Sequence, residues 1–250
     1  MLQVLMGVAV LALFLVWITV GVRLLLLARR TRGFPEFALG LALLLQAGLG
    51  YPLSVLGQHA GSLETEVTAL SSVFMNSGCL LIYVFTAQVF HPRSRLAWAV
   101  VGAAGALLAV HGFGSALAHA AATTEAEKMA AIQRWAVWIF LLTGGSWGWT
   151  GLESLRHYLR LRKRARLGLA DPVVRNRMGL WAAMGILVVG SVVVDAALLF
   201  SGDETAQKLI LPLVTSASGL AVSVLLLLAF LPPRAYLAAL RRGAAGAPSA

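Results

Sequence analysis

The stretch ETEVTALSSVFMNSGCLLIYVFTAQVFHPRSR, residues 64–95, decides the fold of this chain. It begins with two acidic residues, Glu64 and Glu66, and continues as an apolar run to Phe90. A helix that rises about 1.5 Å per residue crosses the hydrocarbon layer with about 20 apolar residues, so this run is long enough for one membrane span. The chain leaves the span at His91-Pro92-Arg93, where a proline and a charge end the helix. The stretch therefore predicts a helical membrane protein.

A fainter copy of this pattern occupies residues 204–234. Its apolar run carries Ser218-Gly219 and ends at Pro233-Arg234, and the two pairs keep the separation of Ser77-Gly78 and Pro92-Arg93 in the first stretch. The echo predicts a weak repeat of helices 1–3 in helices 5–7.

The composition extends the membrane prediction to the whole chain. Its 250 residues are 59% hydrophobic and 12% charged, and the mean hydropathy of +0.84 exceeds that of ordinary soluble domains. Seven apolar runs are long enough to span: 2–28, 36–57, 66–90, 96–118, 129–153, 178–200 and 205–231. They leave no room for a soluble domain. We expect an all-α integral membrane protein, a single seven-transmembrane-helix bundle over residues 1–250, with residues 232–250 as a cytoplasmic tail.

The charges predict the orientation of this bundle. Of the 20 Lys and Arg residues, 17 fall on one side of the alternating spans, and Lys128, Arg134 and Lys208 fall on the other. The positive-inside rule then places the N-terminus outside and the C-terminus in the cytoplasm. The net charge of +10 is thus a topology feature and does not indicate nucleic acid. The first run lacks a basic start, so we expect a retained helix, and the Ala-, Leu-, Gly- and Arg-rich composition favours a bacterial inner (plasma) membrane.

Polar residues inside the spans are the candidates for function. In the third span they recur at three- and four-residue steps and share one face, which must point into the bundle: Thr68, Ser72, Asn76, Cys79, Tyr83 and Thr86. Gln46 of the second span lies at a depth similar to Asn76, and the following Gly48 to Pro52 predicts a kink or a close contact. The two amides either join helices by hydrogen bonds or contact a ligand.

Asp195 and Lys208 form the most specific constellation. Both lie roughly 6 to 8 Å below the outer boundary on consecutive antiparallel helices, at about 1.5 Å per residue. Because an unpaired carboxylate in a membrane is costly, we expect an ion pair between them, with Arg134 as the competing cation. The pair is either a structural salt bridge or part of an outward-facing ligand pocket. The pocket hypothesis gives it a rim of Asp195, Lys208, Arg134, Trp135, Trp138 and Tyr51 and a floor of Asn76, Ser72 and Ser216.

Tryptophans and arginines leave further alternatives open. Trp135 and Trp138 near one end of the fifth span, and Trp147 and Trp149 near the other, fit either interfacial aromatic belts or a pocket lining. The loop after this span begins a basic segment that predicts a cytoplasmic protein partner or contact with anionic membrane lipids: Arg160, Arg162, Lys163, Arg164 and Arg166. Asp171-Pro172 predicts the start of the next helix.

No catalytic or metal site is predicted. Cys79 is the single cysteine, which excludes an internal disulfide and a cysteine-based metal cluster. His111 and His119 lack a third ligand at helical spacing, so we expect no metal, no cofactor and no enzyme activity.

The order of the spans resembles the three-plus-one-plus-three plan of the SWEET sugar transporters and, more loosely, of the microbial opsins. The likeness covers roughly 30 residues at each end and implies the architecture alone. The Pro-Gln pair expected of SWEET repeats is absent, and Ser216 to Gly219 occupy the place of an opsin's Schiff-base lysine. The histidines do not have the spacing of the seven-helix ceramidase and adiponectin-receptor-like hydrolases. Arg32 to Phe37 and Phe90 to Arg93 are similar to segments of bacterial seven-helix membrane proteins of uncharacterised activity.

Two hypotheses about function follow. The first is a sensor or receptor-like protein that binds a small or lipid-like molecule in the outer half of the bundle. The second is a small-solute transporter with a site near the midplane. A transporter needs polar groups through both halves of the membrane, whereas Val222 to Leu231 has only Ser223 as a polar residue. This pattern favours a dead-end pocket and hence the sensor.

Overall fold

The computed structural model describes residues 2–57, 60–165 and 167–245, apart from some side chains within these ranges, that of Lys208 among them. All regular structure in these ranges is helical. The α-helices are α1 (Leu2–Thr31), α2 (Phe34–Leu43), α3 (Tyr51–Gly57), α4 (Glu64–Phe90), α5 (Arg95–Ala121), α6 (Glu125–Ala165), α7 (Pro172–Phe200), α8 (Glu204–Phe230) and α9 (Arg234–Ala245). A π-helix, η1 (Leu44–Gly50), joins α2 to α3, and a 3₁₀ turn, η2 (Gly61–Leu63), precedes α4.

Within the described ranges six helical segments are long and apolar enough to cross a membrane: α1, the continuous α2–η1–α3 segment, α4, α5, α7 and α8. The chain is therefore an all-helical, multi-pass membrane protein. The predicted span 129–153 lies in α6, which has 41 residues and is the least apolar of the long helices. At about 1.5 Å per residue α6 is about 61 Å long, roughly twice the hydrocarbon thickness.

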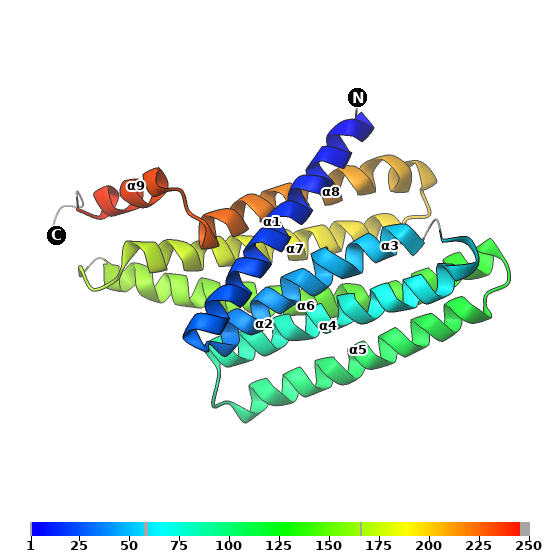
Figure 1. Cartoon of the computed structure of the whole chain (residues 1–250), viewed down its shortest axis with the longest axis horizontal. Coiled ribbons are helices and arrows are strands. Elements are labelled where there is room, and N and C mark those ends of the chain that lie inside the picture. The colour runs from blue at the N-terminus through cyan, green and yellow to red at the C-terminus, as the bar shows by residue number, and fades with distance from the viewer. Residues whose placement is uncertain (1, 58–59, 166, 246–250) are drawn as a thin grey trace.

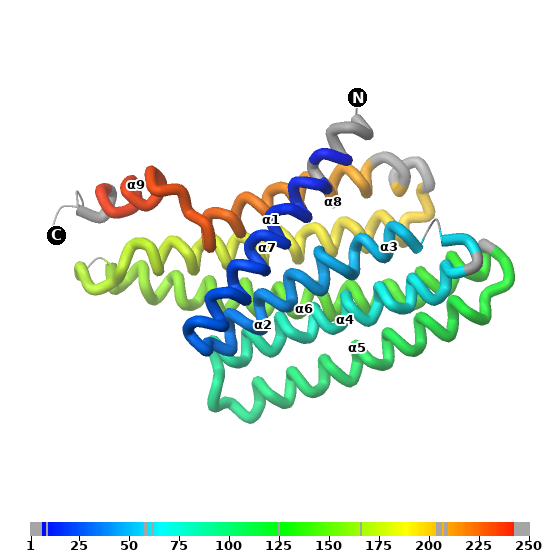
Figure 2. The backbone as a smooth tube through the Cα atoms, viewed as in Figure 1, coloured from blue at the N-terminus to red at the C-terminus, as the bar shows by residue number. Residues whose placement is uncertain are grey.

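The long helices lie side by side, with α1 crossing the others at an angle (Figure 1), and their contacts form a closed ring. α1 packs against both α2 and α8, so the first and last long helices are neighbours. The ring continues from α2 through α4 and α6 to α7 and α8, while α5 packs on the outside against α4 and α6. The backbone trace in Figure 2 shows the connections alternating between the two ends of the bundle.

One end of the bundle carries most of the arginines, and we call it the basic end. It holds the α1–α2 turn, the α4–α5 turn, the α6–α7 connection and α9, and α6, α7 and α9 extend beyond the two turns (Figure 1). The segment predicted as a tail from residue 232 is helical from Arg234, after Pro232 and Pro233 have ended α8. Asn176 of α7 donates to the Tyr236 hydroxyl of α9 at 2.8 Å, which ties α9 to the bundle.

Short-range sequence patterns set the helix starts. Asp171 accepts a hydrogen bond from the Val173 amide at 2.7 Å and Pro172 follows it, which confirms the predicted start of α7. Thr124 and Glu127 form a capping box at the start of α6, because each side chain accepts a hydrogen bond from the other residue's amide.

Glycine pairs bring neighbouring helices close together. A Cβ on Gly185 of α7 would lie 2.5 Å from the Gly151 Cα of α6, so only glycine fits on either side of this contact. Gly21 of α1 and Gly40 of α2 form a similar contact, in which a Cβ on Gly40 would lie 2.9 Å from the Gly21 carbonyl oxygen. Small residues at such crossings permit the close backbone packing that holds membrane helices together.

The core is aromatic at its centre. Trp147 of α6 is 2% exposed and stacks on Trp181 of α7 with ring centroids 6.4 Å apart. Of the two alternatives for Trp147, its burial excludes the interfacial belt, because the side chain points into the ring and contacts Trp17 of α1 as well as Trp181. Trp149, two residues further, points away from this stack and lies against His91, with ring centroids 6.2 Å apart.

Candidate functional site

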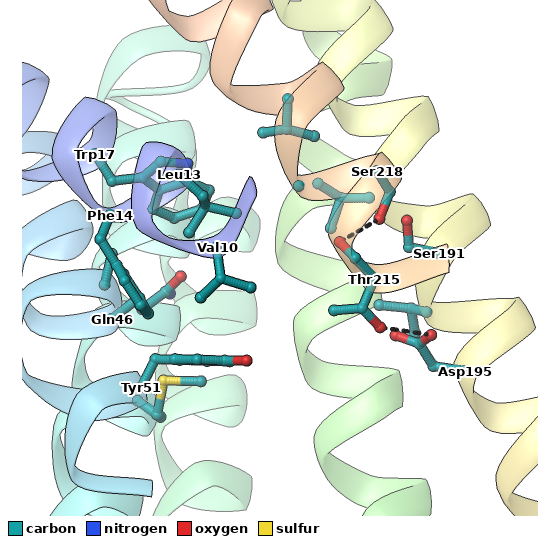
Figure 3. Close-up of a pocket in the computed structure, with 16 residues that line it drawn as sticks. Val10, Leu13, Phe14, Trp17, Gln46, Tyr51, Ser191, Asp195, Thr215 and Ser218 are labelled. Carbon is teal, nitrogen blue, oxygen red and sulfur yellow. Dashed lines mark hydrogen bonds between the residues drawn. The ribbon is translucent and has the colours of Figure 1, made fainter. Parts of the chain in front are cut away.

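A cavity of about 230 Å³, here called the Asp195 cavity, opens between α1 and α8 and contacts η1, α3, α4 and α7. Figure 3 shows two facing walls. One wall, from α7 and α8, carries Ser191, Asp195, Thr215 and Ser218, and the other carries aromatic rings from α1 and α3. Asp195 lies five residues before the C-terminal end of α7, in the half of the bundle away from the basic end.

The α7–α8 wall is rich in hydrogen-bond acceptors. The hydroxyls of Ser191 and Ser218 donate to carbonyls of their own helices, at 2.9 and 3.2 Å. Thr215 has a single hydroxyl proton and lies 2.9 Å from the Leu211 carbonyl but 3.4 Å from the Asp195 carboxylate. Its proton is thus better placed for the carbonyl. The wall therefore turns a carboxylate and hydroxyl lone pairs toward the cavity, with its donors already used.

The facing wall is aromatic. Phe14 and Tyr51 lie with ring centroids 5.1 Å apart, and Trp17 lies one turn further along α1 than Phe14. The Trp17 Nε1–H is buried and has no hydrogen-bond partner in the described part of the chain. Gln46 completes this wall (Figure 3). The cavity thus sets one carboxylate and its neighbouring hydroxyls opposite three aromatic rings and the Gln46 side chain.

The π-helix places Gln46 and Tyr51 in this wall. Pro52 has no N–H, and its ring would collide with the carbonyl four residues earlier in a regular α-helix. The chain widens instead to i→i+5 bonding, and the Tyr51 N–H donates to the Gln46 carbonyl. On the facing helix, a Cβ on Gly78 would lie 3.0 Å from the Ala42 carbonyl oxygen, so Gly78 permits this close approach of α4. The kink or close contact predicted for Gly48 to Pro52 is confirmed as an irregularity, which begins earlier than predicted, at Leu44.

The cavity is closed on the side of the basic end. Val222, at its floor, belongs to a cluster of buried apolar residues with Leu24, Ile82, Met184 and Leu226. Aromatic rings continue from the floor through this cluster, from Trp17 to Trp147 at 6.0 Å and from Trp147 to Trp181, and Trp181 contacts Phe230 at 5.7 Å. The described side chains of this cluster therefore form an apolar layer between the cavity and the basic end.

A second cavity of about 340 Å³, here called the His111 cavity, lies between α4, α5 and α6. Ser72 and Thr68 of α4 line it, together with His111 of α5 and Trp135 of α6. At its mouth Lys128 donates to Glu64 at 3.1 Å, and His119 Nε2 lies 3.5 Å from the same carboxylate. These contacts join α4, α5 and α6 at the end of the bundle away from the basic end.

Asn76 fixes the tautomer of His111. Its amide nitrogen lies 3.2 Å from the Leu108 carbonyl and 3.2 Å from His111 Nδ1. Because the carbonyl can only accept, Asn76 presents its NH₂ here and donates to both atoms. The neutral His111 ring then carries its proton on Nε2.

The polar face predicted for the third span is confirmed. Tyr83 donates to the Leu142 carbonyl of α6 at 2.9 Å, and Thr86 bonds Thr150 of α6. Cys79 is 2% exposed and lies 3.7 Å from Ser146. These residues join α4 to α6, whereas Asn76 joins α4 to α5.

The single pocket predicted from the sequence is divided into two. Asp195 and Tyr51 line the Asp195 cavity, and Ser72 and Trp135 line the His111 cavity. The reason is the orientation of α4, which turns its polar face toward α5 and α6 and presents Met75 to the Asp195 cavity. The remaining predicted residues line neither cavity: Asn76 is engaged with α5, Trp138 is 46% exposed, Arg134 is exposed and Ser216 is half-buried. The Lys208 side chain lies outside the described part, so its pairing with Asp195 stays a prediction.

Sequence reasoning missed Phe14, Trp17, Ser191, Thr215 and Ser218. Their spacing contains a usable pattern, since each pair on one helix lies three or four residues apart: Phe14 and Trp17, Ser191 and Asp195, Thr215 and Ser218. The patterns show shared faces but not that these faces meet, because that depends on α1 closing the ring against α8.

The predicted basic partner segment lies on the extension of α6. Arg160, Arg162 and Arg164 are exposed there, with Lys163 beside them, and Arg166 lies outside the described residues. Arg241 and Arg242 of α9 are exposed at the same end. Among the described residues no three His, Cys, Asp or Glu side chains lie close enough together to hold a metal ion.

Comparisons with known proteins name no relative. No protein-family model matches the chain, and neither a curated protein nor a solved structure matches it significantly. The function is therefore argued from the site alone.

Proposed function

We propose that the chain is a seven-span membrane sensor that binds a small or lipid-like ligand in the Asp195 cavity. The observation that carries this proposal is the cluster of apolar side chains beneath the cavity, in which Trp17 and Val222 pack. A ligand that enters such a cavity leaves by the way it came. Binding without passage is what a sensor does, whereas a transporter needs access from both sides.

The seventh span of this proposal is α6. Its length exceeds the hydrocarbon thickness, and the predicted span 129–153 occupies its middle part. With seven spans the N-terminus lies outside, and the basic end lies in the cytoplasm of a cell whose inner membrane holds the protein. The ring order also keeps the proposed repeat, since α1–α2–α4 and α6–α7–α8 are two arcs of consecutive neighbours.

The output of the sensor is the extension at the basic end. The rings of Trp17, Trp147, Trp181 and Phe230 connect the cavity floor to the end of α8, four residues before α9 begins. A shift of Trp17 on ligand binding would move this stack, because packed cores change between discrete arrangements rather than deform smoothly. The movement changes how the exposed arginines of α6 and α9 bind an acidic cytoplasmic protein or anionic membrane lipids.

A small-solute transporter is the second candidate, and broken helices favour it. The α2–η1–α3 segment contains a π-helix beside the cavity, and α8 contains Pro212 within its length. Transporter sites are commonly built on such interrupted helices. For transport, the core cluster around Met184 and Leu226 would have to open toward the basic end.

Native mass spectrometry of the purified protein tests the sensor. We expect a small molecule that co-purifies with the wild type and with Leu220→Phe, and that is lost from Ser218→Phe. Ser218 lines the cavity, so a phenyl ring there fills it, whereas Leu220 is 44% exposed on the outer face of the same helix. Equal occupancy in both variants would contradict ligand binding in the Asp195 cavity.

Proteoliposomes then separate the two functions. The molecule recovered from the protein is supplied outside the vesicles, and its accumulation inside is followed with wild type and Ser218→Phe. A sensor gives no uptake beyond that of Ser218→Phe. Uptake that requires an open cavity would establish the transporter instead.

A further inference from the structure

The chemistry of the Asp195 cavity selects for charge as well as for size. Its α7–α8 wall carries one carboxylate and three hydroxyls. The Ser191 and Ser218 hydroxyls donate to backbone carbonyls, and the Thr215 hydroxyl lies within reach of both the Leu211 carbonyl and the Asp195 carboxylate. Among the described residues no Lys, Arg or His is part of the lining, and the Lys208 side chain lies outside them. A neutral or anionic ligand would leave the carboxylate without a cationic partner in the described lining, and an ionised carboxylate in a membrane is costly unless it is paired.

The facing wall also suits a positively charged ligand. The rings of Phe14, Trp17 and Tyr51 stand across the cavity from Asp195 (Figure 3). Aromatic faces attract cations, most strongly when the cation has lost its water, and quaternary ammonium groups are bound in this way. An aromatic wall opposite a carboxylate therefore surrounds a cation on both sides.

We propose that the ligand of the Asp195 cavity is an amphipathic organic cation, with its ammonium group between Asp195 and the aromatic wall and its apolar part over the remaining lining. This inference rests on the proposed function, because it names the ligand class of that same site. The cavity of about 230 Å³ has room for a single ring carrying a small onium group.

The test uses phenyltrimethylammonium and tert-butylbenzene, which have the same shape and differ in charge. Full-length protein in detergent is titrated with each compound, and the thermal unfolding midpoint is followed, since a ligand that binds the folded state raises it. We expect the cation to raise the midpoint of the wild type and the neutral compound to raise it less. In Asp195→Asn the apparent affinity for the cation should fall about tenfold or more, because the carboxylate loses its charge.

Matched variants test whether cation binding depends on Asp195 and its cavity. Glu66→Gln removes a carboxylate that is exposed at the same end of the bundle, and it should bind the cation like the wild type. Ser218→Phe should lose the response to both compounds. Lys208→Gln should bind the cation equally well or more tightly, since any competition of Lys208 for Asp195 is then removed. Loss of cation binding in Lys208→Gln would overturn the proposal.

The outcomes separate this inference from the function on which it rests. If both compounds stabilise the wild type and Asp195→Asn alike, but not Ser218→Phe, the cavity binds ligands and the cation assignment is overturned. If neither compound shifts the wild type, the cation assignment is overturned as well, while the native mass spectra decide the proposed function independently.

Discussion

Asn76 shows how one side chain can organise two helices inside a membrane. Its amide donates to the Leu108 carbonyl and to His111, and its own oxygen is buried with no hydrogen-bond partner among the described residues. Interhelical hydrogen bonds in membranes contribute about 0.6 to 2 kcal/mol each. The residue therefore stabilises the attachment of α5, the helix outside the ring.

Replacing Asn76 should loosen α5 measurably. Asn76→Leu keeps the size and removes both donated bonds, so we expect a loss of about 1 to 2 kcal/mol. For a chain of this size that loss lowers the unfolding midpoint by about 2 to 4 °C per kcal/mol, measured by thermal unfolding in detergent. Ser77→Ala is the control, because no hydrogen bond of the Ser77 side chain is found in the described residues. Equal midpoints for the two variants would contradict the role of Asn76.

The hydrogen bonds of Glu127 should make the start of α6 less stable at acidic pH. Its carboxylate accepts hydrogen bonds from the backbone and side chain of Thr123 and from the Thr124 amide, and these hold the pKa of Glu127 below its ordinary value. A lowered pKa in the folded state means that the contribution to stability is present above the ordinary pKa of about 4.3 and is lost as the pH falls through the lower folded value.

Hydrogen exchange at the first turn of α6 measures this effect. We expect protection of the amides of residues 123–128 to be high at neutral pH and to fall once Glu127 is protonated. Glu127→Gln should be less protected already at neutral pH and should lack the acid-dependent loss, whereas Glu66→Gln should behave as the wild type. An acid-dependent loss that persists in Glu127→Gln would assign it to another group.

The sequence predicted some of the site residues and not their arrangement. Asp195 stood out because an acid within an apolar run needs an explanation, and the structure places it in a cavity. Trp17 did not stand out, because one tryptophan in an apolar helix fits any position. Ser72 was assigned to the wrong cavity, since a polar face shows that it points inward but not which neighbour it meets.

At the scale of elements, glycine contacts decide how closely the helices pack. Gly185→Ala places a methyl group against the Gly151 backbone and must push α6 and α7 apart. We expect a loss of about 1 to 3 kcal/mol, as for overpacked cores, and a midpoint lowered by several degrees in thermal unfolding. Gly190→Ala is the matched control on α7, because a Cβ there meets no atom within 4 Å. A similar loss in both variants would contradict the role of the contact, because helix propensity alone favours alanine over glycine.

Element boundaries followed from the sequence where local chemistry sets them. Asp171-Pro172 fixed the start of α7, because capping depends on neighbouring residues alone. The extension of α6 to Ala165 was not predicted, since its basic second half reads as a loop when only hydropathy is considered. The π-helix was predicted only as an irregularity, because Pro52 shows that regular bonding fails but not how the backbone adapts.

At the scale of the whole molecule, hydropathy predicted that the chain is a helical membrane protein, whereas the closed ring needed the structure. The contact of α1 with α8 joins segments almost the full chain apart, and the Gly219 side of α8 lies against Leu13 of α1. Nothing local in either helix encodes this pairing, and the Asp195 cavity depends on the ring that it closes.

The proposed seventh span makes a prediction about sidedness that the six apolar helices alone do not. If α6 crosses the membrane, the α5–α6 and α6–α7 connections lie on opposite sides. In a Cys79→Ser background, Ala121→Cys should react with a membrane-impermeant maleimide in intact cells, because Ala121 is exposed at the end of α5. Leu169→Cys, at a position that is 72% exposed, should react only after the membrane is opened.

Labelling of both positions from the same side would mean that α6 does not cross. The basic end would then no longer lie on one side of the membrane, and the coupling of an outer cavity to a cytoplasmic extension would fail with it.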